Sequence, residues 1–242
     1  MLGFRYKLPE DFFKGAVDVH CHLLPGVDDG FKTTEKSLHA LEVLESHGIE
    51  KMLLTPHFMK DYQENDRAYI TERFEAFKAE ASKVSGIQLF LGAEYMLDSR
   101  FMEHFNQGFL TLDKKGTHVL CETSYLMYEP NISQMLYDVM CEGKQPVIAH
   151  PERYMYAVRD NYFRWRDKRY KFQLNLLSLA GAYGAPAVAK ANYLLKEGFY
   201  DYVGSDMHGL DNFRHFLPKL RLSKKNIDRL AQLIENNKTL FE

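Results

Sequence analysis

Histidines and acidic residues recur in short groups along the whole sequence, from His20 and His22 to Asp206 and His208. Imidazole and carboxylate together suit Zn²⁺, Mn²⁺ or Fe²⁺, whereas a purely structural zinc site is richer in thiolates. Two such ions held close together generate a nucleophile at neutral pH and bind phosphoryl oxygens. The sequence therefore predicts a centre of two or three divalent metal ions that hydrolyses a phosphate ester. The predicted ligands are His20, His22, Asp29, His57, Glu94, Glu122, His150, Asp206 and His208.

The first group, Asp18-Val19-His20-Cys21-His22, has alternating spacing. Because side chains of a strand alternate between its two faces, His20 and His22 are expected to point the same way, and Asp18 with them. Two imidazoles on one face can bind one ion, and a carboxylate behind them can orient a ring. Asp28 and Asp29 follow in a turn-like string, and only Asp29 is interpreted as a ligand.

Short apolar runs and longer amphipathic stretches alternate along the chain, which predicts strands and helices in turn. The predicted strands are 16–24, 51–55, 88–93, 118–122, 146–149, 172–176 and 202–204. The predicted helices include 38–45, 70–81, 135–140, 186–196 and 224–237, and most of them precede a glycine that can end a helix. The aromatic-rich stretch 153–171 is expected to be a loop with at most a short helix.

Seven strands that are each followed by helix-like sequence predict an α/β fold, with a parallel sheet closed into a distorted (β/α)7 barrel. Active sites of such barrels lie at the carboxyl ends of the strands. Six of the seven predicted strands end in a histidine or a carboxylate, and burying these groups together without metal would leave uncompensated charge at large cost. The positions of these residues therefore favour one shared metal centre.

The 242 residues carry a net charge of −2 and 26% charged residues, as in an ordinary single globular domain, here predicted over 1–242. This charge gives no basic field for nucleic acid, and no apolar run is long enough to span a membrane. The start of the chain lacks a signal-peptide pattern, so a cytoplasmic protein is expected. A cysteine phosphatase is excluded because none of Cys21, Cys121 and Cys141 has an arginine six residues later.

Other polar residues are interpreted as structural. His39, His47, His104 and His118 fall on predicted helices or at a strand start, while His215 is a weaker candidate near the last group. The basic and aromatic stretch 153–171 is interpreted as a solvated, partly packed loop that could still dock an anionic or aromatic substrate.

Several of these groups resemble motifs of the PHP (polymerase and histidinol phosphatase) superfamily, in order and over nearly the whole chain. They are Asp18-Val19-His20-Cys21-His22, Asp28-Asp29-Gly30, Thr55-Pro56-His57, Gly92-Ala93-Glu94, Ala149-His150-Pro151-Glu152-Arg153 and Ser205-Asp206-Met207-His208. Within the superfamily the chain resembles the manganese-dependent protein tyrosine phosphatases encoded with bacterial capsule and exopolysaccharide systems. Residues 1–14 extend beyond the usual start of such proteins.

The resemblance implies a trinuclear site in which manganese is favoured, with iron or zinc as alternatives. One ion would be held by His20, His22, Glu94 and Asp206, with Asp206 also counted among the catalytic residues. His57, Glu122 and His150 would serve the other ions with Asp29 and His208, and Glu94 would bridge. Arg153 would bind the phosphate. Arg214 is the nearest match to a second arginine of the family, although its context departs by about one residue.

The function implied by the resemblance is hydrolysis of phosphotyrosine, with a membrane-bound bacterial tyrosine kinase that controls polysaccharide export as the substrate. Phe58 and Tyr125 are candidates for flanking the phenyl ring. Two alternatives remain: a small-molecule phosphatase acting on a compound such as histidinol phosphate, and a non-catalytic regulator that keeps the metal fold. A DNA exonuclease is disfavoured by the charge. The oligomeric state, including a homo-oligomer, stays open.

Overall fold

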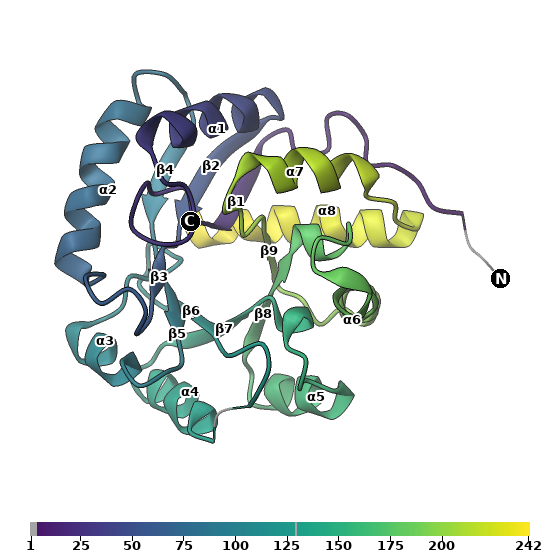
Figure 1. The fold of residues 1–242 in the computed structure, drawn as a ribbon. Coiled ribbons are helices and arrows are strands. Elements are labelled where there is room, and N and C mark those ends of the chain that lie inside the picture. Colours follow the sequence, from purple (N-terminus) through teal and green to yellow (C-terminus); the bar gives the residue numbers. More distant parts are fainter. Residues whose placement is uncertain (1–3, 129) are drawn as a thin grey trace.

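The computed structural model describes residues 4–128 and 130–242, so residues 1–3 of the predicted N-terminal extension lie outside it. Parallel strands form a curled sheet with helices around its outside (Figure 1). The described strands are β1 (Ala16–Cys21), β2 (Ile49–Leu54), β3 (His57–Phe58), β4 (Gln88–Leu91), β5 (Glu94–Met96), β6 (His118–Glu122), β7 (Gln145–Ala149), β8 (Lys171–Asn175) and β9 (Tyr202–Gly204).

The described strands occupy seven positions around the barrel, which we call staves. The chain passes once through the stave formed by β2 and β3 and once through the stave formed by β4 and β5, with an interruption in each. Gly92 N donates to Leu54 O (2.9 Å) and Glu94 N donates to Pro56 O (3.1 Å), so the two passages stay paired across both interruptions. Pro56 has no N–H to donate, which explains a break in the ladder at that point. Each interruption comes immediately before a predicted ligand, His57 in one case and Glu94 in the other.

Hydrogen bonding divides the staves into a sheet of order β1-β2-β4 and a sheet of order β3-β5-β6-β7-β8-β9. The barrel closes beyond the end of β9, where Cys21 and Met207 form a parallel bridge. Asp206 N donates to His20 O (2.8 Å) and His22 N donates to Met207 O (3.0 Å) at this seam. The predicted distorted (β/α)7 barrel is therefore confirmed, and the divided ladder is its distortion.

All five predicted helices are present: α1 (Thr34–Ser46), α2 (Arg67–Ala81), α4 (Ile132–Cys141), α6 (Gly184–Glu197) and α8 (Lys224–Lys238). Three further helices are α3 (Phe101–Gln107), α5 (Arg159–Asp167) and α7 (Leu210–Phe216). Helix α5 occupies the middle of the predicted loop 153–171 and buries only Tyr162 and Trp165, which is too narrow an apolar stripe to recognise from sequence. No helix of the described residues is long and apolar enough to cross a membrane.

Apolar side chains fill one part of the barrel. Val17, Val19, Leu120 and Val147 form a buried cluster that includes Leu240 and Phe241, near the C-terminal end of the chain. The buried polar residues include His20 near the end of β1, Glu94 at the start of β5, His150 directly after β7 and Asp206 two residues after β9. Polar groups therefore gather at one rim of the barrel while apolar groups pack elsewhere in it.

Candidate metal centre

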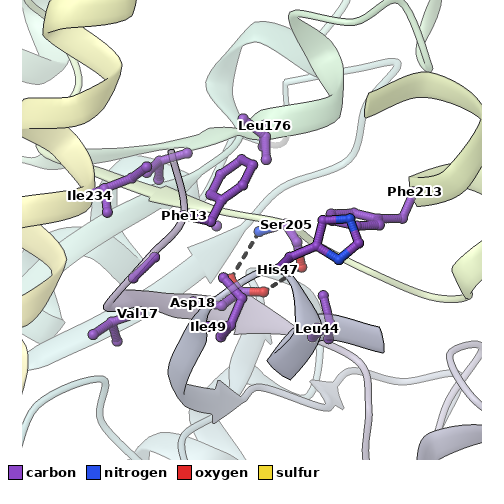
Figure 2. Close-up of a pocket in the computed structure, with 13 residues that line it drawn as sticks. Phe13, Val17, Asp18, Leu44, His47, Ile49, Leu176, Ser205, Phe213 and Ile234 are labelled. Carbon is purple, nitrogen blue, oxygen red and sulfur yellow. Dashed lines mark hydrogen bonds between the residues drawn. The ribbon is translucent and has the colours of Figure 1, made fainter. Parts of the chain in front are cut away.

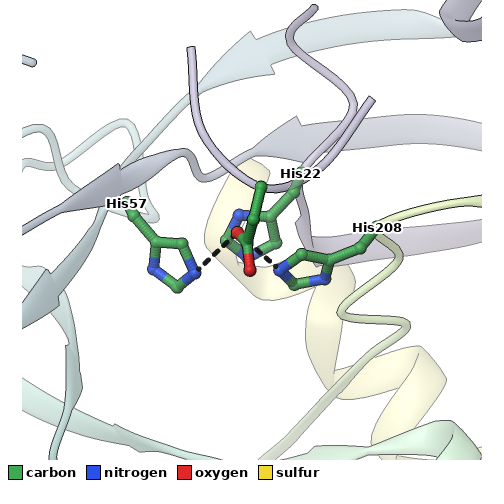
Figure 3. Close-up of side chains that lie close together, drawn as sticks. His22, His57 and His208 are labelled. Atoms are coloured by element: carbon green, nitrogen blue, oxygen red, sulfur yellow. Dashed lines mark ion pairs between the residues drawn. The ribbon is translucent and has the colours of Figure 1, made fainter. Parts of the chain in front are cut away.

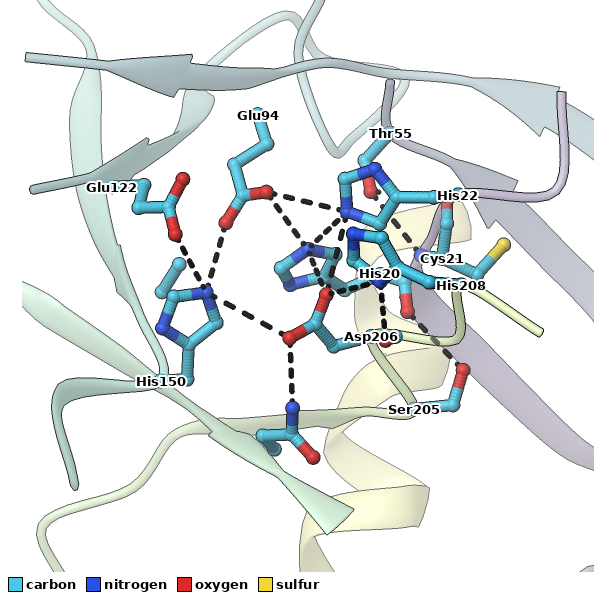
Figure 4. A network of polar contacts seen from close by, with 12 residues as sticks. His20, Cys21, His22, Thr55, Glu94, Glu122, His150, Ser205, Asp206 and His208 are labelled. Atoms are coloured by element: carbon cyan, nitrogen blue, oxygen red, sulfur yellow. Dashed lines mark hydrogen bonds and ion pairs between the residues drawn. The ribbon is translucent and has the colours of Figure 1, made fainter. Parts of the chain in front are cut away.

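All nine predicted ligands come together at the carboxyl rim of the barrel. Figure 4 shows those other than Asp29 and His57 in the network of polar contacts. Three overlapping groups have ligand atoms that lie within 4.8 Å of one another and could each hold an ion. The groups are His20, Glu94, His150 and Asp206; His57, Glu94 and Glu122; and His22, Asp29, His57 and His208. Residues separated by nearly two hundred positions in sequence thus share one small volume.

The four residues expected to hold the first ion lie close to one another. His20 Nε2 and His22 Nε2 are 3.2 Å apart. Each lies 3.3–3.4 Å from Glu94 Oε2 and from Asp206 Oδ1. Ligands about 2.0–2.2 Å from a tetrahedral ion are separated by roughly 3.4 Å, so these spacings fit a coordination shell.

Glu94 has the central position among the ligands. Its Oε2 lies 3.1 Å from His57 Nδ1, and its Oε1 lies 3.0 Å from His150 Nε2. Glu122 adjoins the same two rings, at 3.7 Å from His57 Nδ1 and 3.5 Å from His150 Nε2. Glu94 belongs to two of the candidate groups, and its two oxygens face different histidines, so it could serve more than one ion.

Asp29 lies at the solvent-facing side of the cluster, beside His57 and His208, whose rings are labelled with that of His22 in Figure 3. Its Oδ1 lies 3.4 Å from His57 Nε2 and 3.3 Å from His208 Nε2. The Asp29 side chain is 58% exposed, whereas those of Glu94 and His20 are fully buried. The cluster therefore has a closed interior and an open outer side.

Three buried ligand atoms of the cluster make no hydrogen bond to any described residue, although charged groups lie close to them. Glu94 Oε2, Asp206 Oδ1 and His57 Nδ1 are buried without a hydrogen bond in the described structure. Leaving such groups unpaired is costly, and divalent ions that suit nitrogen and oxygen ligands would satisfy all three. These residues therefore fit a bound metal centre.

The electrostatics of the metal-free chain lead to the same interpretation. Burial lowers the pKa of His20, but the carboxylates of Glu94 and Asp206 outweigh it and raise that pKa to about 9. Burial opposes ionisation of Asp206, yet His20, His22 and other nearby cationic groups hold its pKa well below the usual range. In the metal-free chain the buried carboxylates are balanced by protonated histidines, and bound cations would take over that balance.

Two ligand residues have unusual backbones. His150 (φ +31°) and Asp206 (φ +50°) lie in the left-handed region, directly after β7 and two residues after β9, respectively. This conformation is uncommon for residues other than glycine and costs of order 1–3 kcal/mol. Such strain persists where surrounding structure enforces it, typically at functional sites, and here it occurs at two strand ends of the cluster.

The residues that orient the first two histidines were not predicted as such. His20 Nδ1 donates to Gln173 Oε1 (2.9 Å), and His22 Nδ1 donates to Asp28 Oδ2 (2.8 Å). Asp28 was interpreted only as part of a turn, although its position beside Asp29 was a usable signal. Gln173 lies inside β8, the stave whose end carries no histidine or carboxylate, and nothing in the sequence distinguishes it.

The prediction that Asp18 shares the face of His20 and His22 is wrong. Asp18 pairs with Met52 while Cys21 pairs with Leu54, so β1 contains one extra residue and its alternation is broken. Asp18 instead accepts bonds from Ser205 N (2.9 Å) and Ser205 Oγ (2.5 Å), in a mainly apolar pocket of its own (Figure 2). Its role is to fix the backbone directly before Asp206.

Arg153 lies beside the cluster as expected for a phosphate-binding residue. Its Nη1 is 2.5 Å from Asp206 Oδ2. Its Cζ is 4.4 Å from the ring centroid of Tyr125 and 4.1 Å from that of Tyr183. Tyr125 also donates a hydrogen bond to the Glu122 carboxylate. The guanidinium is thereby held by two aromatic rings next to the ligands.

Arg214 is not brought into the cluster, so its predicted role is not supported by its position. It lies on α7, is exposed, and its Nη2 contacts His39 Nε2 (3.0 Å) on α1. Asn212, two residues earlier, lines the cleft that contains Arg153, Asp206 and His208. The resemblance implied an arginine displaced by about one residue from Arg214, and on a helix a one-residue shift turns a side chain by about 100°.

Two of the three remaining candidates, Phe58 and His215, lie away from the cluster. Phe58, proposed as a flank for the substrate ring, is buried against Tyr95 and His104, whereas Tyr125 does lie at the site. His215 is exposed and contacts Lys219 rather than the cluster.

The fold and the site together define the class of protein as a parallel α/β barrel with clusters of histidines and carboxylates at its rim that could hold metal. The chain belongs to the CpsB/CapC family of capsular polysaccharide synthesis, whose family model matches residues 16–239.

Relatives of the chain include the tyrosine-protein phosphatase YwqE of Bacillus subtilis (strain 168), 27% identical and covering 93% of both chains. The tyrosine-protein phosphatase CpsB of Streptococcus agalactiae serotype V is 28% identical, covering 81% of this chain and 84% of that one. Among solved structures, one described as YwqE from Bacillus subtilis and CpsB from Streptococcus pneumoniae, unique metal-dependent tyrosine phosphatases, has a TM-score of 0.77 at 23% identity, with 93% of each chain covered. This structural similarity establishes the shared fold.

Proposed function

We propose that this protein is a metal-dependent phosphatase that hydrolyses phosphotyrosine on proteins, with manganese as the favoured ion. The proposal depends on one observation. Arg153 lies beside three overlapping groups of candidate ligands at one rim, and several atoms of these groups have no hydrogen bond within the described part of the chain. The names of its relatives, which are tyrosine-protein phosphatases, support the same activity.

The proposed ligands are the nine residues named above, with Glu94 as the bridge. When bound, the ions supply an activated water and neutralise phosphoryl charge. Arg153 offers a planar set of donors for phosphoryl oxygens and is held in place by Tyr125 and Tyr183. Gln173 and Asp28 fix the orientation of His20 and His22.

Tyrosine is a favourable leaving group for this arrangement. A phenol has a pKa near 10, well below that of an aliphatic alcohol, so departure as phenolate requires less assistance from a general acid. No dedicated acid is therefore assigned among the residues of the site.

Exposure of the outer side of the cluster favours a protein substrate over a small metabolite. The Asp29 side chain is 58% exposed and that of His208 is 28% exposed. A phosphatase for a compound such as histidinol phosphate is expected to enclose its substrate and to place a carboxylate for the amine. An open rim allows a phosphotyrosine within a polypeptide to reach Arg153.

For the partner, we propose a membrane-bound bacterial tyrosine kinase that controls polysaccharide export, with the phosphatase acting in the cytoplasm. Support comes from the family's connection with capsular polysaccharide synthesis. Incubation of the protein with the phosphorylated kinase from the same genome should remove phosphotyrosine, as measured by loss of phosphotyrosine antibody signal. Persistence of that signal beside rapid hydrolysis of other phosphotyrosine proteins would contradict this partner.

The test of the activity compares a phosphotyrosine peptide with histidinol phosphate, using protein stripped by a chelator and then reloaded with Mn²⁺, Fe²⁺, Zn²⁺ or Mg²⁺. Peptide hydrolysis should disappear on chelation, return with metal, and exceed histidinol phosphate hydrolysis by at least tenfold, about 1.4 kcal/mol. The opposite preference would establish the small-molecule enzyme. Hydrolysis that is unchanged in His150→Ala would mean that the measured activity does not come from the metal centre, as expected of a non-catalytic regulator that keeps the metal fold.

A further inference from the structure

Two loops at the carboxyl rim of the barrel, where the ligands lie, expose large apolar side chains. After β6, Leu126 and Met127 are 69% and 65% exposed, and after the short helix Pro151–Arg153, Met155 and Val158 are 69% and 61% exposed. Single apolar residues on a surface are ordinary, but four on two adjoining loops need an explanation. We refer to Leu126, Met127, Met155 and Val158 as the apolar ledge.

Hydrogen bonds and ring contacts hold the two loops together. Met155 N donates to Tyr125 O (2.7 Å), and the hydroxyls of Thr123 and Tyr156 are 2.5 Å apart. The rings of Tyr128 and Tyr156 have centroids 5.6 Å apart. The two loops that carry the ledge are therefore held together by hydrogen bonds and by an aromatic contact.

The apolar ledge is continuous with the proposed phosphate site. Tyr125, whose ring contacts the Arg153 guanidinium, directly precedes Leu126, and Arg153 itself lies two residues before Met155. An extended peptide advances about 3.3 Å per residue, so residues next to a phosphotyrosine at Arg153 fall within reach of the ledge.

The edge of the ledge carries positive charge. Lys190 Nζ donates to the carbonyl oxygen of Tyr154, immediately before Met155 (2.6 Å), and Arg159 directly follows Val158. Cationic groups near an apolar surface complement a peptide that bears an anionic phosphate and apolar side chains.

Resting on the proposed function, we propose that the apolar ledge binds the polypeptide on one side of the phosphotyrosine and selects substrates with apolar residues there. The ledge thus adds a second recognition element to the phosphate site. The occupant is a segment of the substrate protein, and its apolar side chains cover Leu126 and Met155.

The test uses two phosphotyrosine peptides that differ only in flanking residues, leucine and methionine in one and serine in the other, together with free phosphotyrosine. The wild-type protein should favour the apolar peptide by about tenfold in kcat/KM, the effect of burying one or two apolar side chains. The double variant Leu126→Ser/Met155→Ser should lose this preference and keep hydrolysis of free phosphotyrosine within about twofold. Binding of a non-hydrolysable phosphotyrosine analogue of the apolar peptide, followed by fluorescence anisotropy, should weaken in parallel.

Val84→Ser provides the matched control, since Val84 is also exposed but lies between α2 and β4, at the opposite rim. It should preserve the peptide preference. An undiminished preference in the double variant overturns the proposal, as does a change from oligomer to monomer in light scattering with peptide kinetics unaltered, which would assign the ledge to self-association. Absence of hydrolysis of every phosphotyrosine substrate by loaded wild-type protein would instead reject the proposed function itself.

Discussion

The surroundings of the side chains in the cluster restrict substitution at some positions more than at others. The Glu94 carboxylate is fully buried and lies close to four histidines. A shorter or neutral side chain would therefore leave several imidazoles without a partner. The Arg153 side chain is 16% exposed, and its guanidinium contacts two aromatic rings and the Asp206 carboxylate. Roles at the residue scale can therefore be tested separately for ligands, for the groups orienting them and for the arginine.

Arg153→Lys should lower kcat/KM for a phosphotyrosine peptide by about 10²–10³, the cost of removing one preorganised group that stabilises transition-state charge. Lysine keeps the charge but cannot present the planar fork or stack on Tyr125 and Tyr183. The matched change Arg214→Lys should alter the rate by less than about twofold, because that side chain contacts His39 instead. Equal losses in both variants would show that Arg214 does reach the substrate.

Asp28→Asn should weaken metal binding by about 10–100-fold, because the carboxylate that fixes the His22 ring is lost while the ligand itself remains. Metal affinity would be measured by titration of the metal-free protein. Asp11→Asn, an exposed aspartate ahead of β1, should bind metal normally. Normal affinity in Asp28→Asn would remove this residue from the support of the site.

Metal binding should strengthen as pH rises from 6.5 towards 9. In the metal-free chain the pKa of His20 is raised to about 9, because Glu94 and Asp206 outweigh the effect of burial, so the ring keeps its proton in this window. A metal ion must displace that proton, and its affinity therefore increases as the proton becomes easier to remove. Calorimetric titration in buffers of different ionisation enthalpy should show proton release at pH 7.5, and an affinity independent of pH would contradict this linkage.

At the scale of elements, irregular strands place the ligands. The extra residue in β1 turns Asp18 away from His20, and breaks at Thr55-Pro56 and Gly92-Ala93 precede His57 and Glu94. Bulges and breaks of this kind commonly redirect side chains beside active sites. Close packing between β1 and β9 then fixes the spacing of the two strand ends that carry His20 and Asp206.

Gly204→Ala should destabilise the protein by about 1–3 kcal/mol, the usual cost of overpacking, and should also weaken metal binding. A Cβ at this position of β9 would lie 2.5 Å from His20 Cβ and 3.1 Å from His20 N, so the strands must separate. Denaturant unfolding and metal titration measure the two effects. Gly209→Ala is the control, as a Cβ there meets nothing within 4 Å; equal effects in both variants would argue against the packing explanation.

For the whole molecule, metal and fold should be linked, since the ligands come from both sheets of the divided barrel. Chelation should lower the thermal midpoint by roughly 5–10 °C if metal had been present at about 100 times its Kd, which corresponds to about 2.7 kcal/mol. Scanning calorimetry with parallel metal analysis checks this. Asp206→Asn should show a much smaller shift, and an unchanged midpoint after verified metal loss would mean that the barrel closes without help from the site.

Sequence alone was sufficient for the barrel, its staves and the nine residues at its rim, because strand ends and helix periods are local patterns and parallel strands bring their ends together. It could not determine the direction of Asp18, since a bulge depends on pairing with β2. Nor could it determine the partners of His20 and His22, the separation of Arg214 from the cluster, or the exposure of Leu126 and Met155. Those features depend on contacts between segments distant in sequence, and only tertiary packing decides which contacts form.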